Sequence, residues 1–487
     1  MKNALLSVTD KSYLAELALG LGASGWNLYA TSGTLKVLEG TPGVKVLSVG
    51  AITDFPEMMD GRVKTLSPKI FAGILARRDH KPDLDDAAKF GVVLFDLVVV
   101  NLYAFQEHLG KPADEQAAFI DIGGPSLIRA AAKNSMSVCV LTDPKDYGRA
   151  LEVLQEAREF PRAFRAEMAT KAFALTSRYD GMIAGEWGGL KGQALRYGEN
   201  PHQEGRFAPS PLATWKLLQG KELSYNNMLD ADAAYRLAQD FSDPAVAIIK
   251  HTNPCGVASG PEALSALYLK ALECDSQSAF GGIVGVNRPV DGELALEMGK
   301  IFLEVVVAPE FTEEAKSILV AKKNLRLIEW PSPVWAKADM RLAMGGMLTQ
   351  TLDHELGWTD LKVVTTKKPD AAAMSDLKFA WTVAKHAKSN AIVLVKKGVT
   401  LGVGAGQMSR VDSVDISLKK AAGKTISGSV LASDAFFPFR DNIDRLKGLG
   451  ISAIVSPGGS QRDNEVIAAC EEHGIAMVFT GVRHFRH

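Results

Sequence analysis

Short apolar runs recur in the first 150 residues and alternate with segments of helical periodicity. Residues 4–8, 26–30, 95–100 and 137–141 predict strands, and residues 13–21 predict a helix between the first two. The run at 95–100 is apolar enough for a strand that is buried on both faces. This alternation predicts an open parallel α/β sheet, which binds ligands beyond the carboxyl ends of its strands.

The second part of the chain begins where the helical pattern of residues 151–190 ends. Gly198, Asn200 and Pro201 interrupt the pattern, and we place a domain boundary between residues 190 and 191. The polar segment 355–377, which contains Pro369, predicts a linker or surface loop. Further strands are predicted at residues 245–249, 391–395, 451–455 and 475–479. The expected organisation is therefore two α/β domains, residues 1–190 and 191–487.

Composition and charge narrow the class of protein. The chain has 487 residues, 47% hydrophobic and 23% charged, which is enough to bury two cores. Its net charge of -1 offers no basic field to nucleic acid, so local cations must meet any anionic ligand. No apolar run approaches the roughly 20 residues of a membrane span, and the apolar stretch after Met1 is too short for a signal peptide. We expect a cytoplasmic protein without nucleic-acid or membrane partners.

Cysteine usage bears on metal chemistry. The four cysteines form no CxxC pair and do not suit a disulfide framework. Zinc-dependent nucleoside deaminases carry H-x-E followed by P-C-x-x-C. Here His251 is followed by Thr252 and Asn253, so the Glu is absent, and no second Cys follows Cys255 at the required spacing. We expect no catalytic metal, and we expect Cys255 to be a small packed residue.

Polar groups follow the predicted strands of the first domain, at residues 7–11, 31–34 and 101–103. Ser32-Gly33-Thr34 suits a phosphate-binding turn, although most such turns only cap a helix. In the loop 61–65, Arg62 and Lys64 alternate with Val63 and so share one face of an extended segment. The alternative for this loop is a solvated strand edge.

A second signal in the first domain is DIGGP at residues 121–125, followed by an alanine-rich segment. Gly-Gly-Pro should prevent regular structure, and the helix that follows would offer its N-terminus to an anion. Arg129 and Lys133 are four residues apart and share one stripe of that helix. The alternative is a capped surface helix with solvated cations.

The most specific motif in the second domain is a predicted strand that ends in a turn carrying Lys250 and His251. A His there suits a general base near neutral pH, and an adjacent Lys suits stabilisation of an oxyanion. The alternative is that one of the two points into the core, since neighbours on a strand face opposite sides. A second Lys-His pair, Lys385-His386, indicates either two similar halves or a chance repetition.

Three further stretches accompany the Lys-His signal. SAFGG at residues 278–282 would let a flat ring approach the backbone, and GVGAG at 402–406 lacks the complete dinucleotide-binding frame. SDAFFPFRD at 433–441 suits either a planar ligand or an aromatic core corner with a surface ion pair. The cationic end, residues 483–487, suits either phosphate binding or a frayed tail.

In this order the motifs resemble the bifunctional enzymes of purine synthesis that join AICAR transformylase to IMP cyclohydrolase, where AICAR is aminoimidazole carboxamide ribonucleotide. The resemblance spans nearly the whole chain. The matching stretches are SVTDK at 7–11, GRVKTL at 61–66, DIGGP at 121–125, RYGENPHQ at 196–203, LSYNN at 223–227, KHTNPCG at 250–256, SDAFFPFRDN at 433–442 and RHFRH at 483–487. So many ordered matches are more specific than any single motif.

The resemblance implies the fold and the ligands. Residues 1–190 would be a cyclohydrolase domain of methylglyoxal-synthase-like fold, and residues 191–487 a transformylase domain of two cytidine-deaminase-like halves without zinc. The co-substrate would be 10-formyltetrahydrofolate, a folate, and the other ligands AICAR, formyl-AICAR and IMP. The family also implies a homodimer whose transformylase sites lie across the subunit interface.

The resemblance also implies residue roles. In the transformylase, Lys250 and His251 would assist attack of the AICAR amine on the formyl group, and Asn390 would help to hold the formyl oxygen. The AICAR-binding residues would be Arg196, Tyr197, Gly281, Arg410 and Arg483, with Phe436 or Phe437 lining the ring pocket. In the cyclohydrolase, Lys133 would act with Lys64, Tyr103 and Asp121 in ring closure. The nucleotide would be held by Thr9, Asp10, Lys11, Thr31, Ser32, Gly33, Thr34, Arg62, Thr65, Asn101 and Gly123.

Two positions depart from the family pattern. Ser67 and Phe71 stand where relatives usually or often have His. They motivate an alternative, a folate-dependent formyltransferase whose first domain binds nucleotide without catalysis. A non-catalytic nucleotide-binding protein is a third hypothesis, and the intact Lys250-His251 pair argues against it.

Overall fold

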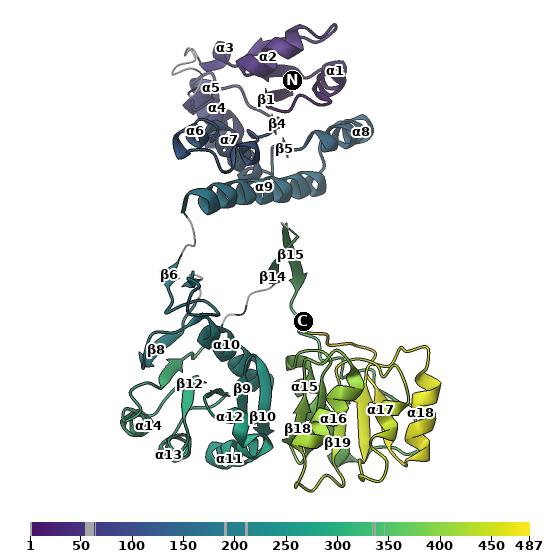
Figure 1. The fold of residues 1–487 in the computed structure, drawn as a ribbon. Helices are drawn as coiled ribbons and strands as arrows, with labels where there is room; N and C mark the ends of the chain where they lie inside the picture. The colour runs from purple at the N-terminus through teal and green to yellow at the C-terminus, as the bar shows by residue number, and fades with distance from the viewer. Residues whose placement is uncertain are drawn as a thin grey trace. The chain divides into compact units, whose positions relative to one another are not determined.

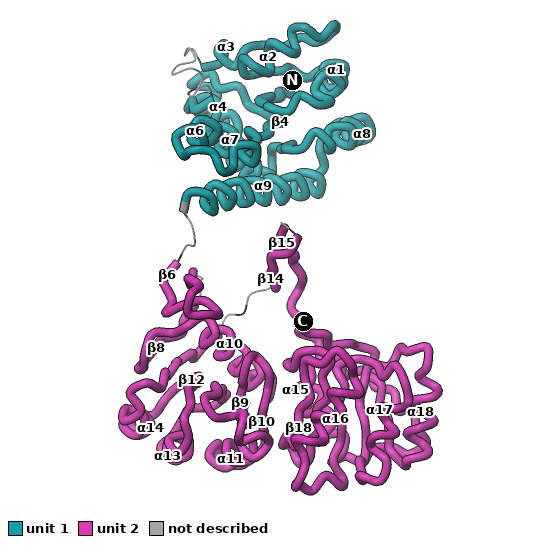
Figure 2. The backbone as a smooth tube through the Cα atoms, viewed as in Figure 1, with its two compact units in different colours: residues 1–190 teal, residues 191–487 magenta. Residues whose placement is uncertain are grey.

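The computed structural model describes residues 2–53, 63, 65–188, 192–209, 213–333, 335, 338–344 and 346–487. Arg62 and Lys64 lie outside the described residues. The chain divides into two compact units, Met1–Leu190 and Lys191–His487, which Figure 2 shows in different colours. Within the described ranges, no helix is long and apolar enough to cross a membrane.

Unit 1 is built on a five-stranded sheet with the order β3-β2-β1-β4-β5, in which every neighbouring pair is parallel. Figure 1 labels three of these strands, β1, β4 and β5. The strands are β1 (Asn3–Ser7), β2 (Asn27–Ala30), β3 (Val46–Ser48), β4 (Leu97–Val100) and β5 (Cys139–Leu141). All four residues of β4 are buried, as its uniformly apolar sequence predicts. Chain order reverses between β1 and β4, which is the position where such sheets bind ligands.

Helices cover the sheet of unit 1. Helix α7 packs on β4 and β5, α9 packs on α7 and β5, and α1 packs on β2. The helices are α1 (Leu14–Ala23), α2 (Ser32–Glu39), α3 (Gly50–Thr53), α4 (Pro68–Leu75), α5 (Lys81–Lys89), α6 (Ala113–Ala117), α7 (Gly123–Lys133), α8 (Tyr147–Ala157) and α9 (Arg162–Gly188), with short 3-10 turns at Phe105–His108 and Pro144–Asp146.

Unit 2 is built on one mixed sheet, which in the described residues has twelve strands. Their order is β16-β21-β20-β19-β17-β18-β10-β9-β11-β12-β13-β8. The strands are β8 (Lys216–Gln219), β9 (Ala245–Lys250), β10 (Asn253–Ser259), β11 (Gly282–Val286), β12 (Leu303–Ala308), β13 (Arg326–Glu329), β16 (Lys362–Val363), β17 (Ile392–Lys396), β18 (Val399–Gly404), β19 (Val430–Ser433), β20 (Ala453–Ser456) and β21 (Ala476–Phe479).

The order of this sheet is an internal repeat. In the first half, β9 and β10 form a hairpin, β11 runs antiparallel to β9, and β12 and β13 follow in parallel. In the second half, β17 and β18 form the hairpin, β19 runs antiparallel to β17, and β20 and β21 follow in parallel. Each half ends on a short antiparallel strand, β8 or β16, and the halves join where β10 pairs with β18.

The helices of unit 2 follow the same repeat. Helix α10 packs on β9, β11 and β12, and α15 packs on β17, β19 and β20. One apolar core is shared by both of these helices, and each half has a further core of its own. The helices are α10 (Tyr225–Gln239), α11 (Leu264–Cys274), α12 (Ser276–Ala279), α13 (Gly292–Met298), α14 (Glu313–Leu319), α15 (Ala371–His386), α16 (Arg410–Lys420), α17 (Asp441–Asp444) and α18 (Asp463–Glu472).

Two small antiparallel pairs complete unit 2. They are β6 (Gln193–Ala194) with β7 (Arg206–Phe207), and β14 (Ala338–Ala343) with β15 (Gly346–Thr351). The described residues of the β14–β15 hairpin expose large apolar side chains, among them Leu342 and Met344.

Two sequence-based expectations are wrong at the level of elements. The segment 355–377 is not a loop throughout, because α15 begins at Ala371 with Asp370 as its N-cap. Gly-Gly-Pro does not precede a helix but forms the first turn of α7, which begins at Gly123. Pro125 is tolerated there because the first N–H groups of a helix have no intrahelical acceptor.

Candidate functional sites

The carboxyl ends of β1, β2 and β4 bring together polar groups of unit 1. Asn101, after β4, accepts hydrogen bonds from the Thr9 N–H at 2.5 Å and the Asp10 N–H at 2.9 Å. Its amide donates to the Asp10 carbonyl at 2.9 Å. Lys11 turns its ammonium toward the Val8 carbonyl. Asn101 therefore shapes the loop after β1 from a buried position.

The loop after β2 leads directly into α2. Thr31 is the N-cap residue of α2, and Ser32 and Gly33 stand exposed in its first turn. Thr34 is buried, and its hydroxyl accepts from the Val8 N–H at 3.0 Å. Thr34 is thus occupied in joining two loops, while the exposed helix N-terminus offers backbone N–H groups to an anion.

A second cluster in unit 1 lies at the start of α7. The Asp121 carboxylate accepts from the Gly124 N–H at 2.7 Å. The hydroxyl of Tyr179, on α9, accepts from the Asp121 N–H at 2.8 Å. Buried Thr65 lies against Gly123, where an added Cβ would meet the Thr65 hydroxyl at 2.9 Å. The structure therefore brings Thr65, Asp121 and Gly123 together.

Of the other residues predicted to act in ring closure, Tyr103 interacts with Tyr179, which contacts Asp121, whereas Lys133 lies apart and Lys64 lies outside the described residues. Lys133 is exposed in the last turn of α7, at the opposite end of that helix from Gly123. Tyr103 follows β4 and is partly exposed. Phe71, one of the two departures from the family pattern, packs against the core of unit 1. The expected Arg62 and Lys64 contacts remain predictions, since these two residues are not described.

The Lys250-His251 pair lies where β9 ends and turns into β10 (Figure 1). The Lys250 ammonium donates to the carbonyls of Gly281 at 2.9 Å and Phe280 at 3.3 Å. Gly281 has a positive φ of 65°, which a glycine adopts without steric cost. His251 is exposed at the turn. The structure thus brings Lys250 and Gly281 together beside an accessible imidazole.

The turn is joined to the second half of unit 2. Asn253 accepts from the backbone N–H of Lys388 at 2.9 Å, and Lys388 belongs to the loop that carries Asn390. Lys385-His386 does not repeat this arrangement, because it ends helix α15 rather than a strand. The equivalent of the Lys250-His251 turn in the second half is the turn between β17 and β18.

Two predicted AICAR-binding residues lie in the loop before β7. The guanidinium of exposed Arg196 lies 4.7 Å from the ring centroid of Tyr197 and donates to the Tyr197 hydroxyl at 3.1 Å. The Arg196 backbone N–H also donates to the Leu223 carbonyl at 3.2 Å. These contacts present a cation and a phenol side by side at the surface.

Asn390 and Arg410 are held by one buried carboxylate. Asp434 is fully buried and accepts from the Ser389 hydroxyl at 2.5 Å, the Ala391 N–H at 3.1 Å, and Arg410. Arg410 in turn donates to the Asn390 side-chain oxygen at 2.7 Å. This network fixes the orientation of both predicted functional residues.

The C-terminal residues are tied to the same loop. Ser389 donates its N–H to the Arg486 carbonyl at 2.9 Å, and the Arg486 N–H donates back to the Ser389 hydroxyl at 3.1 Å. His484 is buried, while Arg483 is exposed and lies over the Phe485 ring. The end of the chain is therefore an ordered part of the site and not a frayed tail.

A cavity of about 380 Å³ opens beside Asn390. It is lined by Asn390, Met408, Ser409, Arg410, Val411, Ala435, Phe436, Pro438, Phe439, Asp441, Asn442 and Phe485. Phe436 is part of this lining, but Phe437 is 1% exposed in the core of the second half. Of the two alternatives, it is therefore Phe436 that lines this cavity, because consecutive side chains here face opposite sides.

One polar atom in this cavity stands out. The side-chain oxygen of Asn442 is buried and has no hydrogen-bond partner, whereas its amide donates to the Phe439 carbonyl at 3.2 Å and to Asp441 at 2.8 Å. A buried acceptor without a donor carries a free-energy cost, which a ligand with an N–H group removes. Asn442 is the last residue of the SDAFFPFRDN motif, which by itself does not show that this oxygen lacks a partner.

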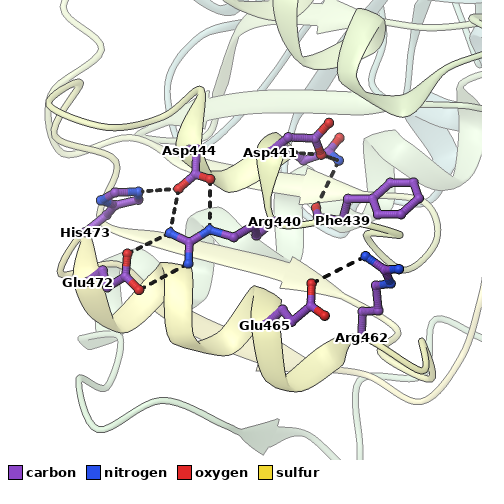
Figure 3. Close-up of polar contacts among 9 residues, drawn as sticks. Phe439, Arg440, Asp441, Asp444, Arg462, Glu465, Glu472 and His473 are labelled. Carbon is purple, nitrogen blue, oxygen red and sulfur yellow. Dashed lines mark hydrogen bonds and ion pairs between the residues drawn. The ribbon is translucent and has the colours of Figure 1, made fainter.

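Arg440, the charged residue beside the aromatic side chains, has a structural role. Figure 3 shows that the guanidinium of Arg440 binds the carboxylates of Asp444 and Glu472, and that the His473 ring also contacts Asp444. Arg440 donates to Asp444 at 3.0 Å and to Glu472 at 2.6 Å. These hydrogen bonds raise the pKa of Arg440 and lower that of Asp444 to about 2. The network fastens α17 to α18 and so supports the wall formed by Phe439 and Asn442. Both alternatives for this stretch therefore contribute, an aromatic pocket and a surface ion pair.

The four cysteines of the two units are free thiols that are buried or partly buried. Burial raises the pKa of Cys255 to about 12, and its thiol donates to the Ile248 carbonyl at 3.5 Å. Cys139, Cys274 and Cys470 are buried free thiols. In the part of the chain that the structure describes, no three His, Cys, Asp or Glu side chains gather where they could hold a metal ion.

Comparison with known proteins places the chain in a family. A family model described as AICARFT/IMPCHase bienzyme matches residues 131–420, and one described as MGS-like domain matches residues 13–126. The MGS-like match and the parallel sheet of unit 1 confirm the predicted methylglyoxal-synthase-like fold. A solved structure titled "Crystal structure of ForH" is 36% identical over 38% of this chain and 98% of that chain, with a TM-score of 0.34.

Curated relatives match over the full length. The bifunctional purine biosynthesis protein PurH of Dinoroseobacter shibae is 49% identical over 529 aligned positions, which cover 100% of this chain and 99% of that protein. The protein of the same name from Mesorhizobium japonicum is 48% identical over 526 positions, which cover 100% and 97%. The chain therefore belongs to the AICARFT/IMPCHase bienzyme family, and it is an enzyme of purine biosynthesis that joins formyl transfer to AICAR with closure of the IMP ring.

Proposed function

We propose that formyl transfer takes place at the β9–β10 turn and ring closure at the carboxyl edge of the unit 1 sheet. The observation that carries the first assignment is the placement of Lys250, whose ammonium is fixed on two carbonyls beside exposed His251. The contact between Asn253 and Lys388 supports the participation of Asn390 in the same site.

The residues suit formyl transfer from 10-formyltetrahydrofolate to AICAR. The amine nitrogen of AICAR attacks the formyl carbon, the bond from that carbon to the folate N10 breaks, and the proton of the amine passes to N10. His251 suits the movement of this proton because it is an accessible imidazole. Lys250 suits stabilisation of the oxyanion, because two carbonyl acceptors hold its ammonium in place. Arg196, Tyr197, Gly281, Arg410 and Arg483 would hold AICAR.

The cavity beside Asn390 fits the folate ring. Its aromatic lining, which includes Phe436, Phe439 and Phe485, suits a flat heterocycle, and its volume lies within the usual range for small-ligand sites. The unpartnered oxygen of Asn442 would accept from an N–H group of the pterin ring. Because Asn390 and Arg410 also line this cavity, a folate there would bring its formyl group toward them.

Ring closure needs a different arrangement. The carboxamide nitrogen of formyl-AICAR attacks the formyl carbon of the same molecule, and the tetrahedral product loses water. The loops after β1, β2 and β4 would hold the nucleotide, with the exposed N-terminus of α2 toward its phosphate. Asp121, Tyr103 and Lys64 would move protons and steady charge there, while Lys133, at the other end of α7, is assigned to ring closure by the family resemblance alone.

We also propose that the enzyme is a homodimer whose transformylase sites receive residues from both subunits. The support is the resemblance to the family, together with the exposed apolar β14–β15 hairpin, which by itself buries little. Sedimentation equilibrium should give twice the 52.3 kDa of one chain, and a species of that single mass would contradict the dimer.

The proposed assignment of ring closure to unit 1 is tested by supplying formyl-AICAR without any folate. The wild-type enzyme should form IMP from it, because ring closure in unit 1 needs no formyl donor. The reaction is followed by the absorbance of IMP. Failure to form IMP would mean that unit 1 binds nucleotide without catalysis and would overturn this part of the proposal.

A further inference from the structure

The turn that carries His251 has an unusual backbone. His251 and Thr252 have φ values of 52° and 61°, in the left-handed region. Two consecutive residues in this region are usual for a tight hairpin turn, but such turns strongly prefer Asn or Asp followed by Gly. A β-branched residue such as Thr is rarely found there, because its side chain crowds the backbone.

Asp230, on α10, lies directly beneath this turn. Its carboxylate accepts from the Thr252 N–H at 2.6 Å and also interacts with the His251 N–H. The side chain is 7% exposed, and burial raises its pKa, while these hydrogen bonds and the charges of His251 and Lys250 act in the opposite direction. A buried carboxylate is thus committed to the two N–H groups of the strained turn.

The second half of unit 2 contains the same device with an ordinary sequence. Its β17–β18 turn consists of Lys397 and Gly398, with φ values of 53° and 67°. Asp376 accepts from both of their N–H groups, at 2.7 Å and 2.8 Å. Asp376 lies five residues after the start of α15 at Ala371, just as Asp230 lies five residues after the start of α10.

The two copies differ at one decisive position. Where the second half has Gly398, which is suited to a positive φ, the first half has Thr252. The second half avoids backbone strain at this position by having glycine, whereas the first half keeps it at Thr252. Backbone strain that is kept in this way indicates a function at the strained turn. Here that copy carries His251 next to Lys250.

We propose that Asp230 is a positioning residue for formyl transfer, whose carboxylate holds the His251–Thr252 turn in its left-handed form and so aims His251 beside Lys250. This inference rests on the proposed role of the turn. Asp230 itself need not touch substrate, because it acts through the backbone of the two turn residues.

The test begins with Asp230→Ala in the full-length enzyme. The expected result is a fall of about 10- to 100-fold in kcat for formyl transfer, the range that a small misplacement of a catalytic group produces. The KM for AICAR should change less than about threefold, because AICAR is expected to be held chiefly by other side chains. Asp230→Asn should retain most of the activity, because the amide keeps an oxygen that accepts from the turn.

The decisive variant combines Asp230→Ala with Thr252→Gly. Glycine adopts a positive φ without help, so this second change should restore at least a few-fold of the lost kcat. A role for Asp230 in packing alone would not be rescued at residue 252. If Asp230→Ala does not fold, Asp230→Glu, whose longer arm displaces the carboxylate, takes its place, and the same loss and rescue are required.

The repeat supplies a matched control, Asp376→Ala, which removes the equivalent carboxylate from the turn that lacks His251. It should leave kcat for formyl transfer unchanged. A normal kcat in Asp230→Ala, or a loss that Thr252→Gly does not relieve, would overturn the inference. His251→Ala distinguishes failure of the proposed function from failure of the role of Asp230. If His251→Ala retains formyl transfer, the proposed function itself fails. If His251→Ala abolishes the reaction while Asp230→Ala does not, only the role of Asp230 fails.

Discussion

At the scale of single residues, the folate binding proposed for the cavity beside Asn390 depends on which polar atoms have no partner within the protein. Asn442 is 2% exposed and lines the cavity together with Phe436 and Phe439, and its side-chain oxygen is buried without a hydrogen-bond partner. The neighbouring Arg440 is committed to Asp444 and Glu472 and so contributes support rather than recognition. In the proposed folate site, recognition of a flat ring would therefore fall to the Asn442 side chain and the aromatic faces.

Replacement of Asn442 should weaken folate binding. We expect Asn442→Ala to raise the KM for 10-formyltetrahydrofolate by about fivefold, which corresponds to the roughly 1 kcal/mol of one neutral hydrogen bond. The KM for AICAR should not change, and steady-state kinetics with each substrate varied in turn measures both. Asn464→Ala, an exposed residue of α18, is the matched control. An unchanged folate KM in Asn442→Ala would remove this residue from the site.

The residues that sequence could predict are those whose role is visible in a local motif. Lys250 and His251 end an apolar strand, and the glycine at 281 marks a close approach, which the Lys250 contact now explains. Asp230 could not be found in this way, because its acceptor role depends on Thr252, 22 residues along the chain. The pair Phe436-Phe437 was ambiguous for the same reason, since only packing decides which ring enters the core.

At the scale of elements, the predicted strands at residues 4–8, 95–100, 245–249 and 391–395 agree with β1, β4, β9 and β17 to within a few residues. Uniform burial makes their apolar runs easy to recognise. The start of α15 was missed because Pro369 suggested a loop. In fact Pro369 immediately precedes the N-cap, Asp370, which accepts from the Ala373 N–H at 2.7 Å. A proline at that place marks the beginning of a helix and not the middle of a loop.

The ends of α10 and α15 are joined by a partly buried charge cluster. Asp240 accepts from Lys385 at 2.8 Å and from His386 at 2.7 Å. Burial acts to raise the pKa of Asp240, but these two partners outweigh it and hold that pKa well below its usual range. Burial also lowers the pKa of His386. The cluster therefore links the two halves through the ionised form of Asp240.

Removal of this carboxylate should make the enzyme less stable in a pH-dependent manner. Because the native pKa is depressed, the stabilisation is complete above the unfolded pKa of about 4 and is lost as the pH falls below it. Asp240→Asn should lower the free energy of unfolding at pH 7 by about 1–2 kcal/mol, an amount that allows for the 35% exposure of the Asp240 side chain.

Urea denaturation at pH 7 and at successively lower pH below 4 measures this difference. The difference in the free energy of unfolding between wild type and Asp240→Asn should become smaller as the pH falls. The surface pair Asp232–Arg236 on the same helix provides the control, since Asp232→Asn should change stability by less than about 0.5 kcal/mol. A gap that stays constant with pH would show that the charge of Asp240 is not what stabilises the structure.

At the scale of the whole molecule, the chain combines two architectures with separate chemistry. Unit 1 gathers polar loops at the switch point of a parallel sheet, and unit 2 doubles one α/β half into a continuous sheet. The sequence indicated two α/β parts, but the equivalence of α10 with α15 and of their two turns is visible only from the strand pairing. That equivalence shows that Lys385-His386 is not a second copy of Lys250-His251.

The most direct test of two independent sites is a double assay of two single variants, His251→Ala and Lys133→Ala, each supplied first with AICAR and 10-formyltetrahydrofolate and then with formyl-AICAR alone. We predict that His251→Ala loses formyl transfer, by about 100-fold or more, and still converts formyl-AICAR to IMP. Lys133→Ala should form formyl-AICAR at the wild-type rate and fail to close the ring. A variant that loses both activities together would contradict the separation of the two sites.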